Sequence, residues 1–167
     1  MAYGYRTGKS VRRPAVVNDG DTPRQSIGSQ LMGDTRNVIE QHISAFNNRD
    51  SRADPWSDDA EMIAPAGTFT GREGVLGFLG VFQAAFSDGT LTVNSWVVDG
   101  GHAAVEGVFA GTHDGVLQSP NGEVPPTGRP ISFRWSASYQ ATGGELCYEH
   151  LYFDQLDFLG QLGLLPE

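Results

Sequence analysis

The chain has 167 residues, a formal net charge of −9 and a single cysteine. This length suits one domain with a sizeable core, and the negative charge argues against nucleic acid as a partner, because phosphate backbones bind positive surfaces. No apolar run reaches the roughly 20 residues of a membrane span, and the first thirty residues lack the apolar segment of a signal peptide. Since Cys147 has no second cysteine to pair with, we expect a cytoplasmic protein.

Residues 1–33 show no hydrophobic periodicity and contain five basic and two acidic side chains. Such a segment is typical of a flexible arm, so we expect one folded domain over residues 34–167. Asp34 is a favourable N-cap for a first helix. The stripe that follows at helical spacing consists of Val38, Ile39, His42, Ile43 and Phe46.

A second helix is predicted after Gly71, because apolar residues recur at positions i, i+3, i+4, i+7 and i+11. These residues are Val75, Phe78, Leu79, Phe82 and Phe86. Between the two helices, residues 47–59 are polar and rich in turn formers, and residues 61–65 are compatible with a short strand.

The second half of the chain alternates with the period of strands. Two hairpins are predicted, one of strands 91–99 and 103–112 and one of strands 131–140 and 145–154. Residues 113–130 between them form a long loop, and residues 155–164 a closing helix. Helices followed by antiparallel strands indicate an α+β fold. A strongly curved antiparallel sheet wrapped on the N-terminal helices would leave a blind cavity, a natural small-molecule site.

The closing strand has an unusual density of ionisable groups. Tyr148, His150, Tyr152 and Asp154 share one face at period two, and Cys147, Glu149, Leu151 and Phe153 share the other. We expect the first face to line the pocket. If the strand faces the other way, or if a bulge intervenes, Glu149 enters the pocket in place of Tyr148.

Four stretches together resemble the SnoaL-like polyketide cyclases, within the nuclear transport factor 2-like superfamily. They are GREGVLGFL at 71–79, GTH at 111–113, PPTGR at 125–129, and EHLYFD at 149–154 followed by QLG at 161–163. The resemblance extends over about 34–165 and implies a cone-shaped α+β barrel with a pocket that uses neither cofactor nor metal. It also implies general acid/base catalysis, as in intramolecular aldol cyclisation of polyketide esters in antibiotic biosynthesis. Other members of the family hydroxylate, open epoxides or only bind ligands.

Within this resemblance, His150 paired with Asp154 is the first candidate for proton transfer. Asp154 is equally suited to cap the closing helix. The family tends to have an acid two residues before this histidine, where this chain has Tyr148, a hydrogen-bond donor but a poor base. Glu149 is the candidate base if the strand faces the other way.

The remaining candidates are expected to bind the substrate. His113 ends a strand at the pocket rim or lies exposed in the loop, and His42 points into the cavity or the core. Arg134 is expected beside Tyr148 across the hairpin, to meet an enolate oxygen or to pair with Glu106. The apolar walls are expected to include Phe78, Phe82, Phe109 and Trp135.

Three functions remain open from the sequence. The first is a cofactor-independent cyclase or isomerase of secondary metabolism, and the second is a non-catalytic module that binds a small apolar ligand. The third is an epoxide-opening or hydroxylating member of the family with the same pocket. Four scattered histidines without clustered acids or cysteines argue against a metal site. We expect a homodimer, because a second copy would cover the exposed sheet face.

Overall fold

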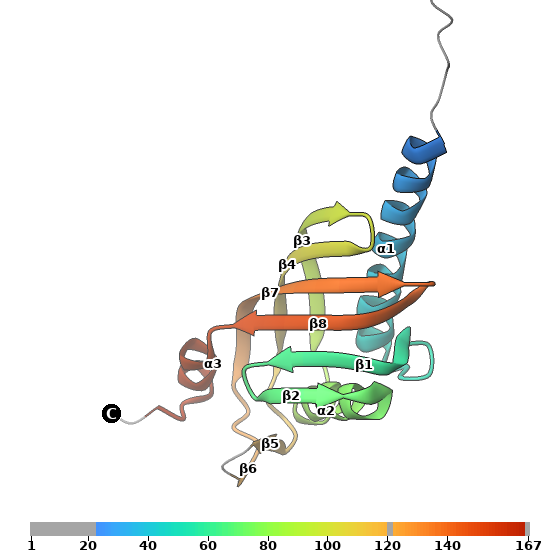
Figure 1. Cartoon of the computed structure of the whole chain (residues 1–167). Coiled ribbons are helices and arrows are strands. Elements are labelled where there is room, and N and C mark those ends of the chain that lie inside the picture. Colours follow the sequence, from blue (N-terminus) through green and yellow to red (C-terminus); the bar gives the residue numbers. More distant parts are fainter. Residues whose placement is uncertain (1–22, 120–121, 166–167) are drawn as a thin grey trace, which may run out of the picture.

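The computed structural model describes residues 23–119 and 122–165, with the backbone alone for residues 23–33 (Figure 1). The predicted α+β class is confirmed: one curved six-stranded sheet carries helices on its inner side. The strand order is β2 (Gly67–Thr70), β1 (Trp56–Ala64), β8 (Glu145–Phe153), β7 (Pro130–Thr142), β4 (His102–Thr112) and β3 (Thr90–Asp99).

Two helices, α1 (Pro23–Asn48) and α2 (Gly71–Ala85), lie on the same side of the sheet, and α3 (Gln155–Leu162) lies at its end (Figure 1). The prediction that the first helix starts at Asp34 is wrong, because α1 already begins at Pro23. Its first turns extend beyond the sheet and need no apolar stripe, which is why periodicity did not reveal them. Residues 1–22 of the expected arm lie outside the described part of the chain.

Helix α2 follows the predicted pattern and buries Val75, Phe78 and Leu79. Its first turn is tied to the connection between α1 and β1 by the guanidinium group of Arg72. The Nη1 atom donates to the carbonyl oxygen of Asp54 at 2.6 Å and to that of Trp56 at 3.0 Å. These bonds fix the loop that carries the Asp54 side chain.

Both predicted hairpins are present, as β3–β4 and β7–β8. The sheet also contains a parallel pair, β1 with β8, which joins the first strand of the chain to the last. Local periodicity did not predict this pairing, nor did it predict β2. The expected loop 113–130 contains a small hairpin of β5 (Leu117–Ser119) and β6 (Gly122–Val124).

A β-bulge sets the faces of β8. Tyr148 pairs with Gln140 and Leu146 pairs with Ala141, so Cys147 is an extra residue without a partner on β7. The extra residue lets both Leu146 and Glu149 point to the inner face, although they are three positions apart. The alternation then continues inward through Leu151, which contacts the core.

Candidate active site

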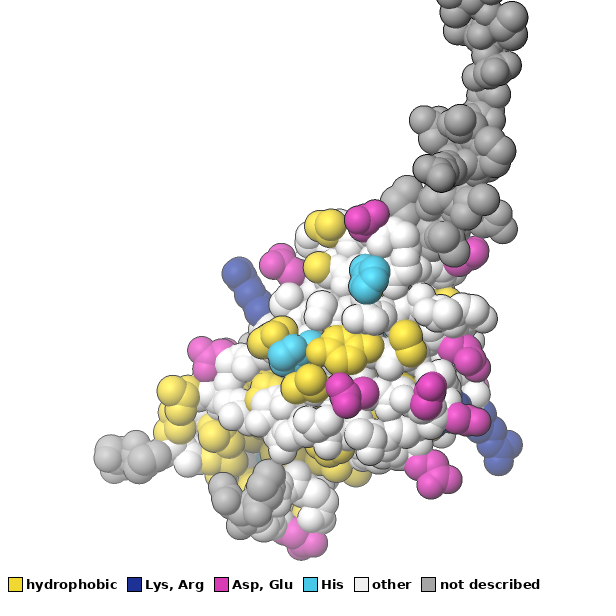
Figure 2. Space-filling model, in the orientation of Figure 1, with side chains coloured by type: hydrophobic (Ala, Val, Ile, Leu, Met, Phe, Trp, Pro, Cys, Tyr) yellow, Lys and Arg dark blue, Asp and Glu magenta, His cyan; other side chains and the backbone are white. Residues whose placement is uncertain are grey.

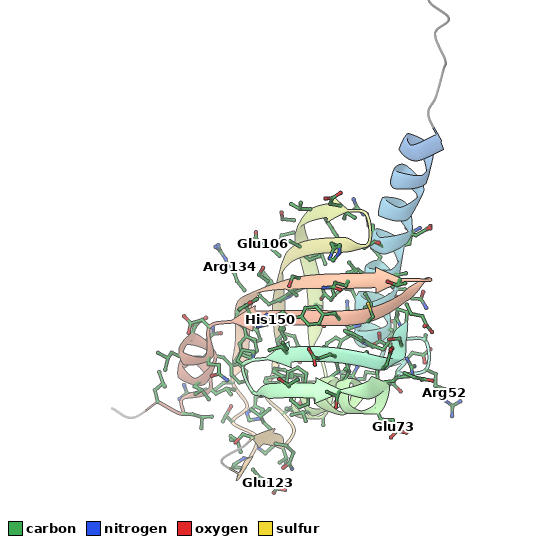
Figure 3. All side chains as sticks on the ribbon, viewed as in Figure 1. Arg52, Glu73, Glu106, Glu123, Arg134 and His150 are labelled. Atoms are coloured by element: carbon green, nitrogen blue, oxygen red, sulfur yellow. The ribbon has the colours of Figure 1, made fainter. Side chains whose placement is uncertain are left out.

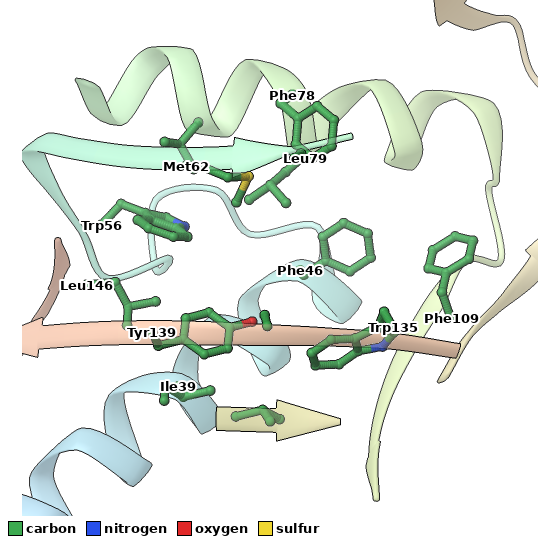
Figure 4. Close-up of a cluster of buried hydrophobic side chains, with 14 of the residues drawn as sticks. Ile39, Phe46, Trp56, Met62, Phe78, Leu79, Phe109, Trp135, Tyr139 and Leu146 are labelled. Carbon is green, nitrogen blue, oxygen red and sulfur yellow. The ribbon is translucent and has the colours of Figure 1, made fainter. Parts of the chain in front are cut away.

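A small cavity of about 50 Å³ lies between the helices and the inner face of the sheet. Figure 4 shows the buried side chains on the inner side of the sheet, and of these Phe46, Leu79 and Tyr139 line the cavity. Its polar lining is limited to His42, Tyr139, Glu149 and the indole of Trp135. The other walls are aliphatic or formed by Phe46, Phe78, Phe82, Phe109, Phe133 and Phe153.

Glu149 projects from β8 into this cavity and is 3% exposed. Its Oε2 atom is buried and has no hydrogen-bond partner among the described residues. Burial raises the pKa of Glu149 from 4.5 to about 7, although the charge of His42 and a hydrogen bond with Tyr139 lower it in part. Such a carboxyl group changes protonation near neutral pH, as a general acid or base must.

His42 of α1 and Asp54 of the α1–β1 loop form a buried pair, with Nδ1 and Oδ1 2.8 Å apart. Because an ionised carboxylate only accepts, Nδ1 carries the proton and Nε2 is the nitrogen that can exchange one. Burial disfavours the charged ring, but the bond to Asp54 and the charges of Asp54 and Glu149 outweigh it and raise the pKa of His42. Trp56 holds the ring in an edge contact at 5.3 Å.

Two further donors belong to residues of the cavity lining. The Tyr139 hydroxyl is hydrogen-bonded to Glu149, and burial together with the charge of Glu149 holds the pKa of Tyr139 well above its ordinary value. Tyr139 therefore stays protonated near neutral pH and can donate a hydrogen bond. The indole Nε1 of Trp135 is buried without a partner among the described residues, although such groups are normally satisfied.

These groups form an acid/base site in apolar surroundings. Glu149 offers an unpaired oxygen, His42 an imidazole oriented by Asp54, and Tyr139 a hydroxyl donor. In a low-dielectric cavity such groups interact more strongly with developing charge than they would in water. The arrangement suits removal of a carbon-bound proton next to a carbonyl group and stabilisation of the resulting oxyanion.

Many of the predicted binding residues lie where the sequence placed them. His42, Trp135, Phe78, Phe82 and Phe109 line the cavity. Of the two positions predicted for His42, the structure shows the one in the cavity lining. The sequence did not predict the contact of His42 with Asp54.

The expected facing of the closing strand is wrong, because the bulge at Cys147 turns Glu149 inward. His150 lies on the outer face, turned away from α1 and α2 (Figure 3), where its Nδ1 contacts the Tyr152 hydroxyl at 2.8 Å and the two rings stack. Tyr148 lies on the same outer face and is also absent from the cavity. The apolar partners of Glu149 at period two, Leu151 and Phe153, required burial and so decided the facing.

Asp154 takes the capping alternative. Its carboxylate accepts from the backbone N–H groups of Leu156 and Asp157 at the start of α3. Arg134 is exposed on the outer side of β7, and no ion pair within 4 Å joins it to Glu106 in the described structure (Figure 3). Arg134 also does not pair with Tyr148, because the register of the hairpin places Gln140 there.

His113 is neither at the rim nor exposed. Its side chain is fully buried against Phe86, with ring centroids 5.2 Å apart. The backbone N–H of Thr127 donates to Nδ1 at 3.2 Å, so the ring pins the loop before β7 to the end of β4. His113 lies outside the lining of the cavity and has a structural role.

The sequence reading missed Asp54 and Tyr139. Asp54 lies in a polar segment that resembled an ordinary turn, and only its contact with His42 distinguishes it. Tyr139 has a detectable signal, since it continues the inward alternation of Phe133, Trp135 and Ala137 along β7. A phenol in such a row requires a buried hydrogen-bond partner, and Glu149 provides it.

The described residues lack two further features. None of their helices is long and apolar enough to cross a bilayer. Their His, Cys, Asp and Glu side chains form no group of three or more that could hold a metal ion.

Comparison with known proteins gives a consistent result. A family model described as the SnoaL-like domain matches residues 39–149. IdmH of Streptomyces antibioticus, a proposed polyketide cyclase, is 30% identical with a TM-score of 0.66, over 77% of this chain and 98% of that chain. No protein with a curated description matches the sequence.

More distant structures share the fold. A proposed SnoaL-like polyketide cyclase from Jannaschia is 15% identical with a TM-score of 0.71, over 89% of this chain and 100% of that chain. AclR of Streptomyces galilaeus, a proposed hydroxylase, is 20% identical with a TM-score of 0.69, over 81% of this chain and 89% of that chain. Because one fold carries different reactions, these two similarities support the architecture alone.

Proposed function

The chain belongs to the SnoaL-like domain family, and we propose that it is an enzyme that cyclises or isomerises a polyketide-type small molecule without a cofactor. The observation that carries the proposal is Glu149: a buried carboxyl group with a pKa raised to about 7 and an unpaired Oε2, inside an aromatic cavity. Burial of an unpaired carboxyl group costs free energy, and carboxyl groups with such shifted pKa values are concentrated at functional sites. The similarity to IdmH supports the same class of substrate.

In the proposed reaction, ionised Glu149 removes a proton from the carbon next to a substrate carbonyl. The electron pair of the broken C–H bond moves onto the carbonyl oxygen, and the Tyr139 hydroxyl, the donor beside Glu149, stabilises the enolate. In a cyclisation the enolate carbon attacks a second carbonyl, which forms the C–C bond, and the new alkoxide takes a proton from His42. Glu149 then returns its proton to His42, which restores both groups.

The experiment that tests this proposal needs no natural substrate. Exchange of the α-protons of 2-tetralone in D₂O, followed by proton NMR, reports enolate formation directly. We expect catalysed exchange whose rate rises as the pH passes about 7, where Glu149 ionises. Glu149→Gln should lower the rate by a factor of 10² or more, on the order expected for a lost general base.

Glu106→Gln is the matched control, because it makes the same chemical change on the exposed outer face. It should leave the exchange rate unchanged. A wild-type rate equal to that of buffer, or a rate that His150→Ala abolishes and Glu149→Gln does not, would contradict the proposal.

A non-catalytic ligand-binding module is the second candidate. It is favoured by the small volume of the cavity, about 50 Å³, which as it stands holds little more than ordered water. Under this alternative the protein binds aromatic ligands, but neither it nor Glu149→Gln accelerates exchange.

We also propose that the protein forms a homodimer through the outer face of the sheet. Figure 2 shows hydrophobic side chains gathered around a histidine on this face. The strand register places small or apolar residues in one row across it: Val97, Ala104, Ser138, His150 and Ile63. Val97 is 66% exposed and Tyr152, in the next row, is 53% exposed. An exposed surface with apolar side chains of this kind suits the self-complementary contact of a two-fold dimer.

A further inference from the structure

A second hollow adjoins the cavity that holds Glu149. This outer groove has a volume of about 660 Å³ and lies between α2, the β5–β6 hairpin and α3. Its size is that of a typical ligand site, whereas the inner cavity is more than tenfold smaller. The outer groove is mainly apolar, with walls that include Phe69, Val81, Leu117 and Phe158.

Three phenylalanine side chains border both spaces, namely Phe78, Phe82 and Phe153. Phe82 is the central one: its ring meets Phe78 at 5.5 Å and Phe153 at 6.2 Å, edge to face in both contacts. The inner cavity and the outer groove are therefore separated by a partition one side chain thick. Phe82 is only partly buried, although its ring also contacts those of Phe86, Phe109 and Phe158.

Glycine residues form part of the floor of the outer groove. Gly74 and Gly77 of α2 line it, and neither has a positive φ that would require glycine. A β-carbon at Gly77 would meet no atom within 4 Å, so close packing does not require glycine there either. The absence of a side chain at Gly77 leaves the helix backbone open to the groove, so that a flat ring can rest against it.

We infer that the outer groove and the inner cavity are two parts of one site for a flat, multi-ring aromatic substrate, with Phe82 as the residue that selects it. The inference rests on the proposed function. At the inner end, a polar group of the ligand would pair with the free Oε2 of Glu149. The groove over Gly77 would hold the rings that are too large for the inner cavity. A substrate carbonyl reaches Glu149 when the ring of Phe82 rotates out of the partition.

Binding at the outer groove is tested with Gly77→Leu, which fills the space over the helix. Gly80→Leu is the matched control, because Gly80 lies on the same helix with no atom within 4 Å of its β-carbon but outside the groove lining. The probes are polyporic acid and 1,8-dihydroxyanthraquinone, and the readout is quenching of tryptophan fluorescence. Polyporic acid is the compound in the crystal structure of TerC, a protein that shares this fold with 16% identity and a TM-score of 0.62. We expect Gly77→Leu to weaken binding at least tenfold and Gly80→Leu to leave it unchanged. The inference is wrong if neither compound binds the wild type or if both variants bind equally well.

The continuity of the two spaces is tested by methyl NMR of the same complexes. Val81, Leu117 and Leu159 report on the outer groove, and Leu79, Leu91 and Leu151 report on the inner cavity. We expect both groups of methyl signals to shift. Shifts confined to the first group would show that a ligand stops at the partition and would overturn the inference.

The role of Phe82 is tested by comparing a large ketone with a small one. Phe82→Ala, or Phe82→Leu if the alanine variant does not fold, should raise the exchange rate of 2-tetralone relative to acetone several-fold. An unchanged ratio contradicts the assignment of Phe82. Acetone exchange separates the two proposals: if Glu149→Gln abolishes it while Gly77→Leu has no effect on ligand binding, the function stands and the two-part site fails. If the ligands bind as expected but the wild type exchanges the protons of acetone no faster than buffer does, the two-part site stands and the proposed function fails.

Discussion

At the scale of single residues, the proposed chemistry depends on one carboxyl group and its three neighbours. Burial raises the pKa of Glu149 to about 7, and the charge of His42 and the hydrogen bond with Tyr139 lower it in part. Asp54 stabilises the charged form of His42 in turn. The protonation states of Glu149 and His42 are therefore coupled, because the charge of each alters the pKa of the other.

The pH dependence of stability follows from the sign of the shift at Glu149. Its pKa is 4.5 before burial and about 7 in the fold, so between these values the folded protein binds more protons than the unfolded chain. Stability due to this group is present below pH 4.5 and is lost as the pH rises through 7. We expect the wild type to lose up to about 3 kcal/mol relative to Glu149→Gln across this range.

Urea unfolding of both proteins at intervals from pH 4.5 to 8 measures this difference. Two parallel stability curves would show that Glu149 titrates as an ordinary exposed carboxyl group.

At the scale of elements, two strand irregularities build the cavity. The bulge at Cys147 brings Glu149 to the inner face of β8. On β4, Gly107 lies opposite Trp135, and the indole ring covers the place where a side chain would begin. The missing side chain at Gly107 lets Trp135 lie flat against the sheet and form one wall of the cavity.

Substitution of Gly107 tests this close approach. A β-carbon there would lie 2.2 Å from the carbonyl oxygen of Thr92 and 2.5 Å from the Trp135 ring. Since the first contact is with backbone, we expect Gly107→Ala to destabilise the protein by about 2–3 kcal/mol and to shift the fluorescence of Trp135.

The matched control is Gly80→Ala, which meets no atom within 4 Å and should stabilise α2 by about 1 kcal/mol. Thermal unfolding of the two variants compares them. A neutral Gly107→Ala would mean that β4 relaxes without cost.

At the scale of the whole molecule, the two faces of the sheet carry different groups. The inner face, with the helices, encloses the acid/base groups, and the outer face carries the ionisable cluster of Tyr148, His150 and Tyr152. We propose that this cluster belongs to the subunit contact, because exposed apolar and aromatic side chains are typical of such contacts.

The homodimer is tested at this scale by size-exclusion chromatography with light scattering. The wild type should have twice the mass of the 18.0 kDa chain at micromolar concentration. Tyr152→Glu places a charge in the contact and should give the monomer, while Glu123→Gln on the distant β6 should not. A monomeric wild type would refute the proposal.

The sequence by itself determined the α+β class, helix α2, both hairpins and the aromatic walls, because these follow from local periodicity and turn chemistry. It also indicated that the closing strand matters and left Glu149 open as the base. Only the tertiary structure decided which face of that strand is buried, since one extra residue at Cys147 reverses the alternation. The pairing of His42 with Asp54, the hydroxyl of Tyr139 beside Glu149 and the parallel contact of β1 with β8 join distant parts of the chain. Such contacts depend on the packing of the whole fold, so no local sequence pattern predicts them.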